Sequence, residues 1–209
     1  MDVSGNVKSR ALDNIAFNGF TETDPAAWKI TGNNGTIDGT HFLGTTDIVP
    51  LNFRVNNQKA GRISGSGQTV FGYLAAHVNT ESYITAIGHL ALYANTSGSR
   101  NTAVGSYSLY SNTTAIDNTA VGYYSSYSNQ TGTYNTSIGS YSMFGNTTGV
   151  YNTAVGYKTL QNTSSYCTAV GFQALYQNSG SSNTAVGAWA LFNNIGGANN
   201  CAFGLNALA

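Results

Sequence analysis

The chain has 209 residues, and its eight Lys and Arg side chains balance eight Asp and Glu side chains to a formal net charge of zero. Only 8% of the residues are charged, against about a quarter in a typical soluble domain. We expect no nucleic-acid partner, because neutralising phosphates requires clustered Lys and Arg. We expect no membrane insertion either, because no apolar run is long enough to span a bilayer.

Residues 1–67 do not repeat, and they carry twelve of the sixteen charged residues. Short strands are predicted at 28–30 and 40–44. Residues 51–55 alternate apolar and polar side chains, Asn56-Asn57 is a turn pair, and residues 59–63 complete a predicted hairpin. We expect 1–67 to be a small β cap and attachment region that covers the open end of the domain that follows.

Residues 68–209 repeat a five-residue motif whose clearest form, Asn-Thr-Ala-Val-Gly, stands at 101–105, 118–122, 152–156 and 183–187. Variants at 68–72, 84–88, 135–139, 167–171 and 200–204 bring the total to nine copies, spaced 15 to 17 residues apart. Each copy closes on a glycine: Gly72, Gly88, Gly105, Gly122, Gly139, Gly156, Gly171, Gly187 and Gly204. So regular a period predicts a repeat architecture in which each unit covers its neighbour.

We number the unit from the motif's Asn, as position 1, to position 17. Positions 3 and 8 are small, position 4 is apolar, position 9 is mostly Leu, and turn-forming Asn, Thr and Gly lie between. The pattern predicts an all-β chain: a parallel β-solenoid or β-roll of nine roughly 17-residue coils, each with two short strands, stacked position on position. The glycine at position 5 indicates a corner with positive φ or a close backbone approach.

The apolar positions predict the core. We expect near-complete burial of the residues at positions 4 and 9, among them Val104, Val121, Val155, Val186, Leu109, Leu160, Leu175 and Leu191. The small residues at positions 3 and 8 would permit close approach between chains, which favours a parallel homotrimer. One coil alone has too little apolar content to bury all its faces.

Catalytic and metal chemistry have little support in the sequence. Cys167 and Cys201 stand two coils apart, about 10 Å, too far for a disulfide, and are expected to be free thiols. The histidines are His41, His77 and His89. No carboxylate or Cys recurs beside His77 and His89 in the repeats, so ladder residues are a better interpretation than a metal site. Paired carboxylates and phosphate-loop motifs are missing from the repeats. We therefore expect neither an enzyme nor a cofactor.

Aromatic residues are the sharper signal. Position 10 is mostly Tyr or Phe, and position 7 carries Tyr107, Tyr124, Tyr141 and Trp189. Stacked from coil to coil, these side chains would form ladders. Two interpretations stay open: packing within the roll or between chains, or an exposed strip that contacts sugar rings or a protein receptor. The Thr file at position 2 leaves a further alternative, an ice-binding face.

The motifs NTAVG, NTSIG and ITAIG, each followed by a small residue three positions after the Gly, resemble the head repeats of trimeric autotransporter adhesins. Similar repeats occur in the fibres of bacteriophages and of phage-tail-like injection particles, and residues 41–63 look like a segment that precedes them there. The resemblance implies a left-handed parallel β-roll with three chains about one axis. The units here are longer, because an Asn-Thr-Thr-Gly loop extends each coil.

From these observations we expect a non-enzymatic trimeric fibre or adhesin segment that mediates cell-surface attachment or receptor recognition. Its expected location is extracellular, on a cell surface, a virion or a phage-tail-like particle. Its expected partners are two further copies of itself, a surface glycan or protein receptor, and baseplate or fibre components. The alternative is a purely structural spacer or adaptor in the tail fibre of a phage or contractile injection particle.

Overall fold

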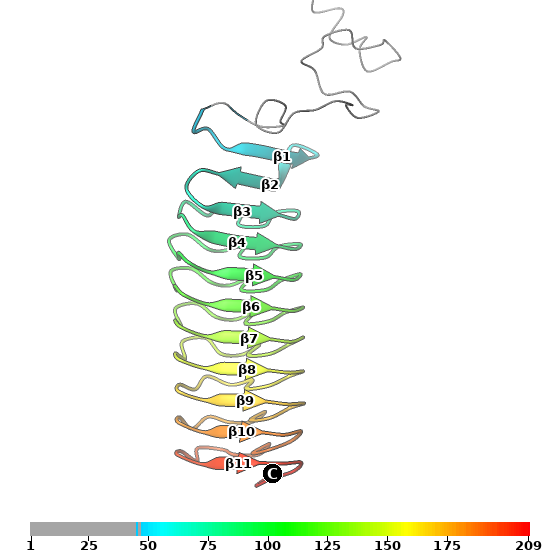
Figure 1. Cartoon of the computed structure of the whole chain (residues 1–209), viewed down its shortest axis with the longest axis vertical. Helices are drawn as coiled ribbons and strands as arrows, with labels where there is room; N and C mark the ends of the chain where they lie inside the picture. Colours follow the sequence, from blue (N-terminus) through cyan, green and yellow to red (C-terminus); the bar gives the residue numbers. More distant parts are fainter. Residues whose placement is uncertain (1–44, 46) are drawn as a thin grey trace, which may run out of the picture. The chain divides into compact units, whose positions relative to one another are not determined.

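The computed structural model describes residue 45 and residues 47–209. The strands predicted at 28–30 and 40–44, and most of the cap predicted over 1–67, lie outside these residues. Residues 47–209 form one compact unit, in which eleven strands are stacked in chain order as a single sheet (Figure 1). The described residues contain no helix, which confirms the predicted all-β class.

The sheet begins with the predicted hairpin. Strands β1 (Leu51–Val55) and β2 (Gln58–Ser64) pair antiparallel. Asn56 and Asn57 turn the chain with φ values of 47° and 57°, which suits the two-residue turns that join antiparallel strands. Strand β2 then pairs antiparallel with β3, so that the hairpin continues the sheet of the coils.

The repeats form a β-solenoid of about eight turns of roughly 17 residues. The ninth motif copy opens a unit of which residues 200–209 are present. From β3 onward all neighbouring strands are parallel. The strands are β3 (Gln68–Phe71), β4 (Ile84–Ile87), β5 (Thr102–Val104), β6 (Thr119–Val121), β7 (Thr136–Ile138), β8 (Thr153–Val155), β9 (Thr168–Val170), β10 (Thr184–Val186) and β11 (Cys201–Phe203).

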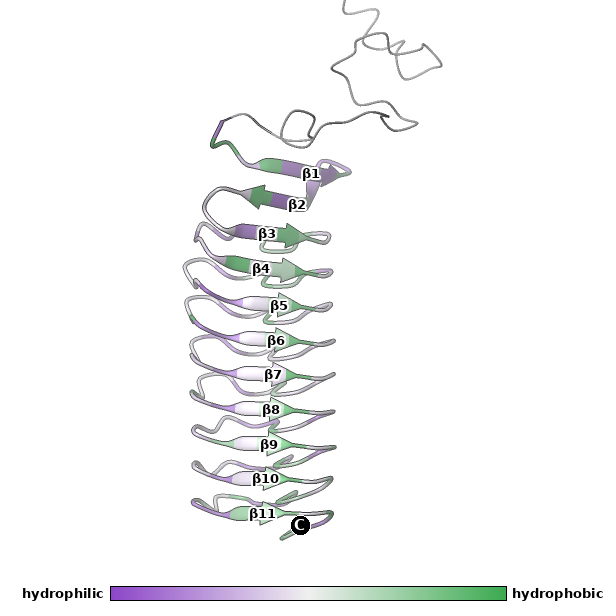
Figure 2. Cartoon of the chain, in the orientation of Figure 1, coloured by the Kyte–Doolittle hydropathy of each residue, from purple (hydrophilic) through white to green (hydrophobic). Residues whose placement is uncertain are grey.

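The coils stack position on position, as predicted. Thr102 pairs with Thr119, and Val104 pairs with Val121, and this register recurs along the sheet. The hydropathy therefore repeats from strand to strand, with a pale start and an apolar end on most rungs (Figure 2).

Each coil holds one strand, not the two that the sequence predicts. After the motif glycine the chain enters turns in which positions 7 and 9 are left-handed, as at Tyr107 (φ 61°) and Leu109 (φ 48°). Left-handed residues interrupt an extended strand. Hydrogen bonds between coils persist here, because Tyr107 N donates to His89 O at 2.9 Å and Leu109 N to Ser125 O at 3.0 Å.

Fewer positions of the repeat are buried in the core than the sequence predicts. The leucines at position 9 are confirmed as core residues, since Leu109, Leu160, Leu175 and Leu191 are at most 3% exposed. The prediction for position 4 is wrong: Val104, Val121, Val155 and Val186 are half-buried, and Phe203 is 66% exposed. Strand side chains alternate between two faces, and position 3 takes the inward one, so positions 2 and 4 point outward.

Positions 3 and 8 also have a different role from the one predicted. Ala103 and Ser108 are 0% exposed within a single chain, as are their counterparts Ala120, Ser125, Ser137 and Ser142. These small side chains let the two walls of one coil approach each other. They are therefore interior residues and offer no contact to a second chain.

Two ladders of buried Asn hold the loops. At position 12, the side-chain amide of Asn129 donates to Asn112 Oδ1 at 2.9 Å and to the Gly132 carbonyl at 3.0 Å. At position 1, Asn118 Oδ1 accepts from the backbone N–H of Asn135 at 3.0 Å. In these coils the loop is thus tied both to its own coil and to a neighbouring one.

The motif glycines share one backbone conformation, with φ between 118° and 139°. A Cβ on Gly122 would lie 2.6 Å from the carbonyl oxygen of Gly139 in the next coil. Both the dihedral angle and the close backbone approach therefore require glycine at this corner.

Candidate binding surface

The structure brings together three of the four aromatic residues singled out in the sequence. The rings of Tyr107 and Tyr124 stack with centroids 4.7 Å apart, and those of Tyr124 and Tyr141 at 5.5 Å. Trp189 lies three coils beyond Tyr141, where it meets the edge of Phe172 at 5.2 Å and donates from Nε1 to an oxygen of Gln173.

A second ladder runs alongside at position 10. Tyr93, Tyr110, Tyr127 and Phe144 stack at 5.1 to 5.3 Å with their ring planes within 8° of parallel. Desolvation among these rings raises the pKa of the Tyr110 phenol, so this group stays neutral at physiological pH. Within both ladders each ring face lies against the next ring. A sugar therefore meets ring edges and hydroxyl groups there, and finds a free ring face only where a ladder ends.

Both ladders are interrupted at the coil formed by residues 152–166. Its position 7 is Lys158 and its position 10 is Gln161, where the preceding coils have aromatic rings. The Lys158 ammonium nitrogen lies 5.4 Å from the ring centroid of Tyr157 and 5.9 Å from that of Tyr141. The Gln161 side-chain amide donates to the Tyr141 carbonyl oxygen.

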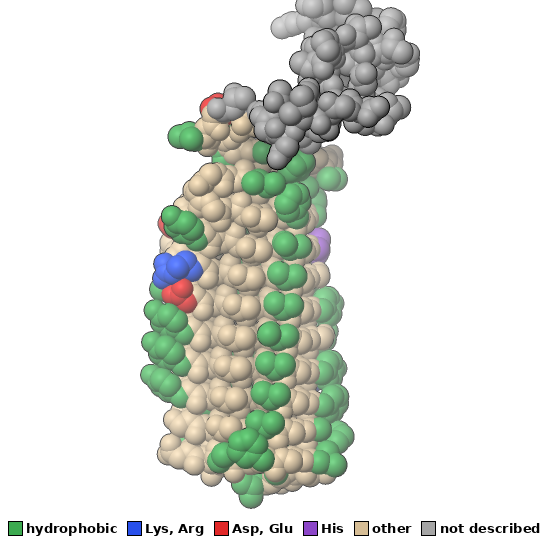
Figure 3. All heavy atoms as spheres, in the orientation of Figure 1, with side chains coloured by type: hydrophobic (Ala, Val, Ile, Leu, Met, Phe, Trp, Pro, Cys, Tyr) green, Lys and Arg blue, Asp and Glu red, His purple; other side chains and the backbone are tan. Residues whose placement is uncertain are grey.

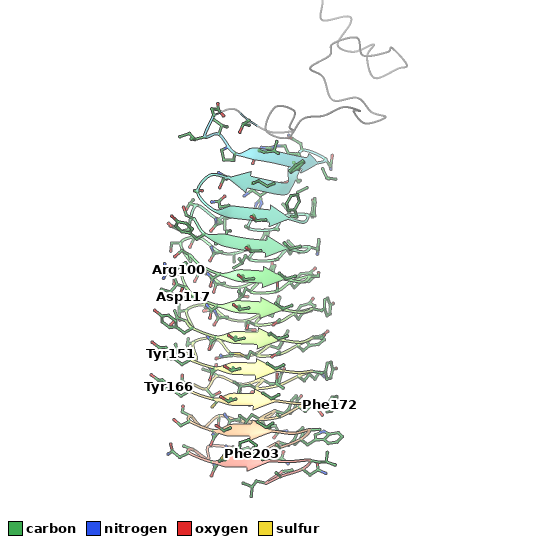
Figure 4. The ribbon with its side chains drawn as sticks, in the orientation of Figure 1. Arg100, Asp117, Tyr151, Tyr166, Phe172 and Phe203 are labelled. Atoms are coloured by element: carbon green, nitrogen blue, oxygen red, sulfur yellow. The ribbon has the colours of Figure 1, made fainter. Side chains whose placement is uncertain are left out.

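A third aromatic file, formed by the last residue before the motif, was missed in the sequence. Tyr134, Tyr151 and Tyr166 are 46%, 51% and 60% exposed and stack at 4.9 and 5.3 Å. Figure 4 places Tyr151 and Tyr166 along one edge of the sheet and Phe172 at the opposite edge. The available signal was the Tyr that directly precedes the motif in three successive units.

The same file carries an ion pair. The Arg100 guanidinium donates two hydrogen bonds, of 2.7 and 2.8 Å, to the Asp117 carboxylate. The hydrogen bond from Arg100 lowers the pKa of the Asp117 carboxyl. The pair is visible as adjacent blue and red side chains above the apolar column at the edge of Figure 3. Because the two charges cancel, this edge offers no net charge to a ligand.

The outward face of the sheet is a uniform, uncharged surface. None of the residues of β3–β11 is charged. Thr at position 2 and Val, Ile or Phe at position 4 point outward on successive rungs, and the apolar file forms a continuous column in Figure 3. Ile87 and Ile138 on this face are 41% and 40% exposed.

The described residues also include two free cysteines and one open pocket. Cys167 is a buried free thiol and Cys201 an exposed one, as expected from their spacing. No three His, Cys, Asp or Glu side chains gather as metal ligands anywhere in the part of the chain that the structure describes. Within that same part, no helix has the length and apolarity to cross a membrane. An open pocket of about 320 Å³ is lined by Trp189, Phe192, Asn206 and Ala209.

Comparison of the chain with protein-family models, with curated proteins and with solved structures gave no match.

Proposed function

We propose that this chain is a segment of a non-enzymatic adhesive fibre, in which three parallel copies pack through their flat sheet faces. The observation that carries the proposal is the apolar file at position 4. It leaves Val, Ile and Phe side chains partly exposed on every rung from β3 to β11. A strip of this length on an uncharged face is typical of a surface that another molecule covers.

A second copy of the chain fits this face well. Every rung offers the same pair of side chains at the inter-strand spacing of about 4.8 Å, so a parallel copy meets it rung for rung. Rotational symmetry closes such an assembly without leaving a face open. The number three follows the resemblance to trimeric adhesin repeats. In this arrangement the aromatic files at both edges of the sheet remain available to a receptor.

Attachment then rests on short-range contacts. The solenoid from 68 to 209 has two positive and two negative side chains, so long-range steering is weak. Tyr hydroxyls and Asn and Thr side chains repeat along the rod and again in each copy. Weak individual contacts to a surface glycan or protein receptor therefore gain strength through multivalency. We propose an extracellular location, on a cell, a virion or a phage-tail-like particle.

A purely structural spacer in a tail fibre is the second candidate. It is favoured by the stacking of Tyr107, Tyr124 and Tyr141, whose ring faces lie against one another rather than toward solvent. Its partners would be fibre or baseplate components, and cells would not bind the isolated rod.

Ice binding is the third candidate, favoured by the register of the Thr file. Thr102, Thr119 and Thr136 are paired across neighbouring strands and partly exposed on a flat face. This function requires the face that the fibre would bury, so the two functions exclude each other. A thermal hysteresis assay on the full chain separates them.

The test of assembly uses the full chain with Val121→Lys and Val155→Lys together. Both side chains point outward, so the coil tolerates the substitutions, while a packed interface would bury two unpaired charges. We expect light scattering to show a trimer for the unmodified chain and a monomer with unchanged circular dichroism for the variant. Thr114→Lys and Thr148→Lys on the exposed loops are the matched control and should stay trimeric. Equal masses for the variant and the control contradict packing through this face.

A further inference from the structure

We infer that the coil of residues 152–166 carries a binding site for an acidic sugar, whose carboxylate the Lys158 ammonium holds. The inference rests on the proposed adhesive function and names the ligand class. This coil departs from the others in three respects: its length, its ladder residues and its charge.

The length changes which side chains are exposed. With 15 residues, this is the shortest coil. Asn146 in the coil before it and Asn178 in the coil after it are buried at position 12, whereas Asn162, which stands at position 11 of this coil, is exposed. Its amide makes no hydrogen bond within the described chain. This coil therefore presents a free donor and acceptor, which suits the hydroxyl groups of a carbohydrate.

The ladder residues change which ring surfaces are free. Phe144 stacks on Tyr127 with one face, at 5.3 Å, and no ring of the described chain stacks on its other face. The position-10 ladder resumes only with Tyr176 and Phe192. At position 6, Tyr157 and Phe172 are 40% and 42% exposed and stack at 5.5 Å, next to Lys158. The exposed parts of Tyr157 and Phe172 thus place apolar ring surface beside the Lys158 ammonium.

The charge selects the ligand class. Residues 68–209 contain two cations, and Arg100 is paired with Asp117. Lys158 makes no ion pair in the described chain, and its ammonium lies over two tyrosine rings. Ring contact stabilises the cation without neutralising it, so the ammonium keeps hydrogen-bond donors for an anion. A single cation suits one carboxylate, while a polyphosphate chain requires several.

The experiment measures binding of the full chain to two acidic probes, 3′-sialyllactose and trigalacturonic acid, and to the neutral sugar lactose, by calorimetry. We expect an acidic probe to bind about tenfold more tightly than lactose, as one charge-assisted hydrogen bond implies. Lys158→Gln should lower its affinity to the level of lactose. Arg100→Gln removes the same charge elsewhere and should leave the preference intact. Tyr157→Ser should weaken acidic and neutral probes alike.

Three outcomes overturn the inference: no binding of either acidic probe, equal affinity for acidic and neutral probes, or an unchanged preference in Lys158→Gln. Circular dichroism and mass are measured for each variant, so that a misfolded variant is replaced by Lys158→Met before the result is judged. The proposed fibre can be refuted independently of this binding site. A monomeric chain that still prefers the acidic probe through Lys158 refutes the fibre and retains the site. A trimer that attaches to cells equally well with Lys158→Gln refutes the site and retains the fibre.

Discussion

The side-chain amide of Asn112 donates a 2.7 Å hydrogen bond to the side-chain oxygen of Asn95 in the preceding coil. Both residues are completely buried. Asn112 in turn accepts from Asn129, so one side chain links three successive coils. From Asn95 to Asn129 a polar ladder therefore runs from coil to coil beside the narrow core of Leu, Ala and Ser. The ladder is interrupted between Asn129 and Asn146, where Asn129 Oδ1 and Asn146 Nδ2 make no hydrogen bond.

Asn112→Ala should lower the free energy of unfolding by about 2–3 kcal/mol, because it removes these hydrogen bonds and leaves the buried amide of Asn129 without one of its two acceptors. Asn162 has the same Asn-Thr context but is exposed, so Asn162→Ala is the matched control and should stay within about 0.5 kcal/mol of the parent. Denaturant titration measures both. Equal losses in the two variants would show that the buried ladder does not stabilise the fold.

Gly122→Ala should destabilise the chain by roughly 1–3 kcal/mol from backbone strain alone, because φ is 137° there. The added Cβ would also approach the Gly139 carbonyl oxygen. At Gly65 a Cβ meets nothing within 4 Å, so Gly65→Ala should be tolerated. Thermal unfolding followed by circular dichroism compares the two, and similar melting temperatures would refute the account of the corner.

The Arg100–Asp117 pair should produce a small pH dependence of stability. Its hydrogen bond lowers the pKa of Asp117 in the folded chain, so its contribution is present above the unfolded-state value of about 4 and is lost as pH falls through the folded-state pKa. The difference in melting temperature between the parent and Asp117→Asn should accordingly shrink in acid. It should also shrink in high salt, because the pair is exposed. A difference that persists at the lowest pH would point to another cause.

The two tyrosine files should respond differently to substitution. Replacing Tyr107, Tyr124 and Tyr141 with Ser removes half-buried stacked rings and should lower the melting temperature. The same change at Tyr134, Tyr151 and Tyr166, which are more exposed, should cost less stability. If either file contacts a receptor, its variant loses cell attachment while the trimer mass is retained. Normal attachment by both variants would leave the binding site elsewhere.

The sequence predicted the architecture because the repeated motif directly indicates a stack of equivalent units. Nine copies of one motif allow only a stack, and the alternation in 51–55 around Asn56-Asn57 correctly predicted the hairpin. Which face of each strand points inward was harder to predict. Alternation divides a strand into two faces without saying which one points inward, and a bulky Val at position 4 suggested a core that is in fact built from Ala, Ser and Leu.

The absence of a second strand in each coil could not be predicted for a different reason. It depends on left-handed backbone at residues such as Leu109 and Tyr124, which have no intrinsic preference for that conformation. Contacts between coils impose it. The aromatic ladders were visible in the sequence, but the covering of their ring faces follows only from the parallel ring planes. The break at Lys158 and Gln161 becomes meaningful once the ladders it interrupts are known.

The mass of the unmodified chain in solution tests the central claim most directly. One copy has a mass of 21.9 kDa. If the apolar file at position 4 packs against further copies, sedimentation equilibrium at micromolar concentration should give three times that mass. A single-copy mass under the same conditions, with the circular dichroism of a folded β chain, would contradict the account, because the file would then face water in the native protein.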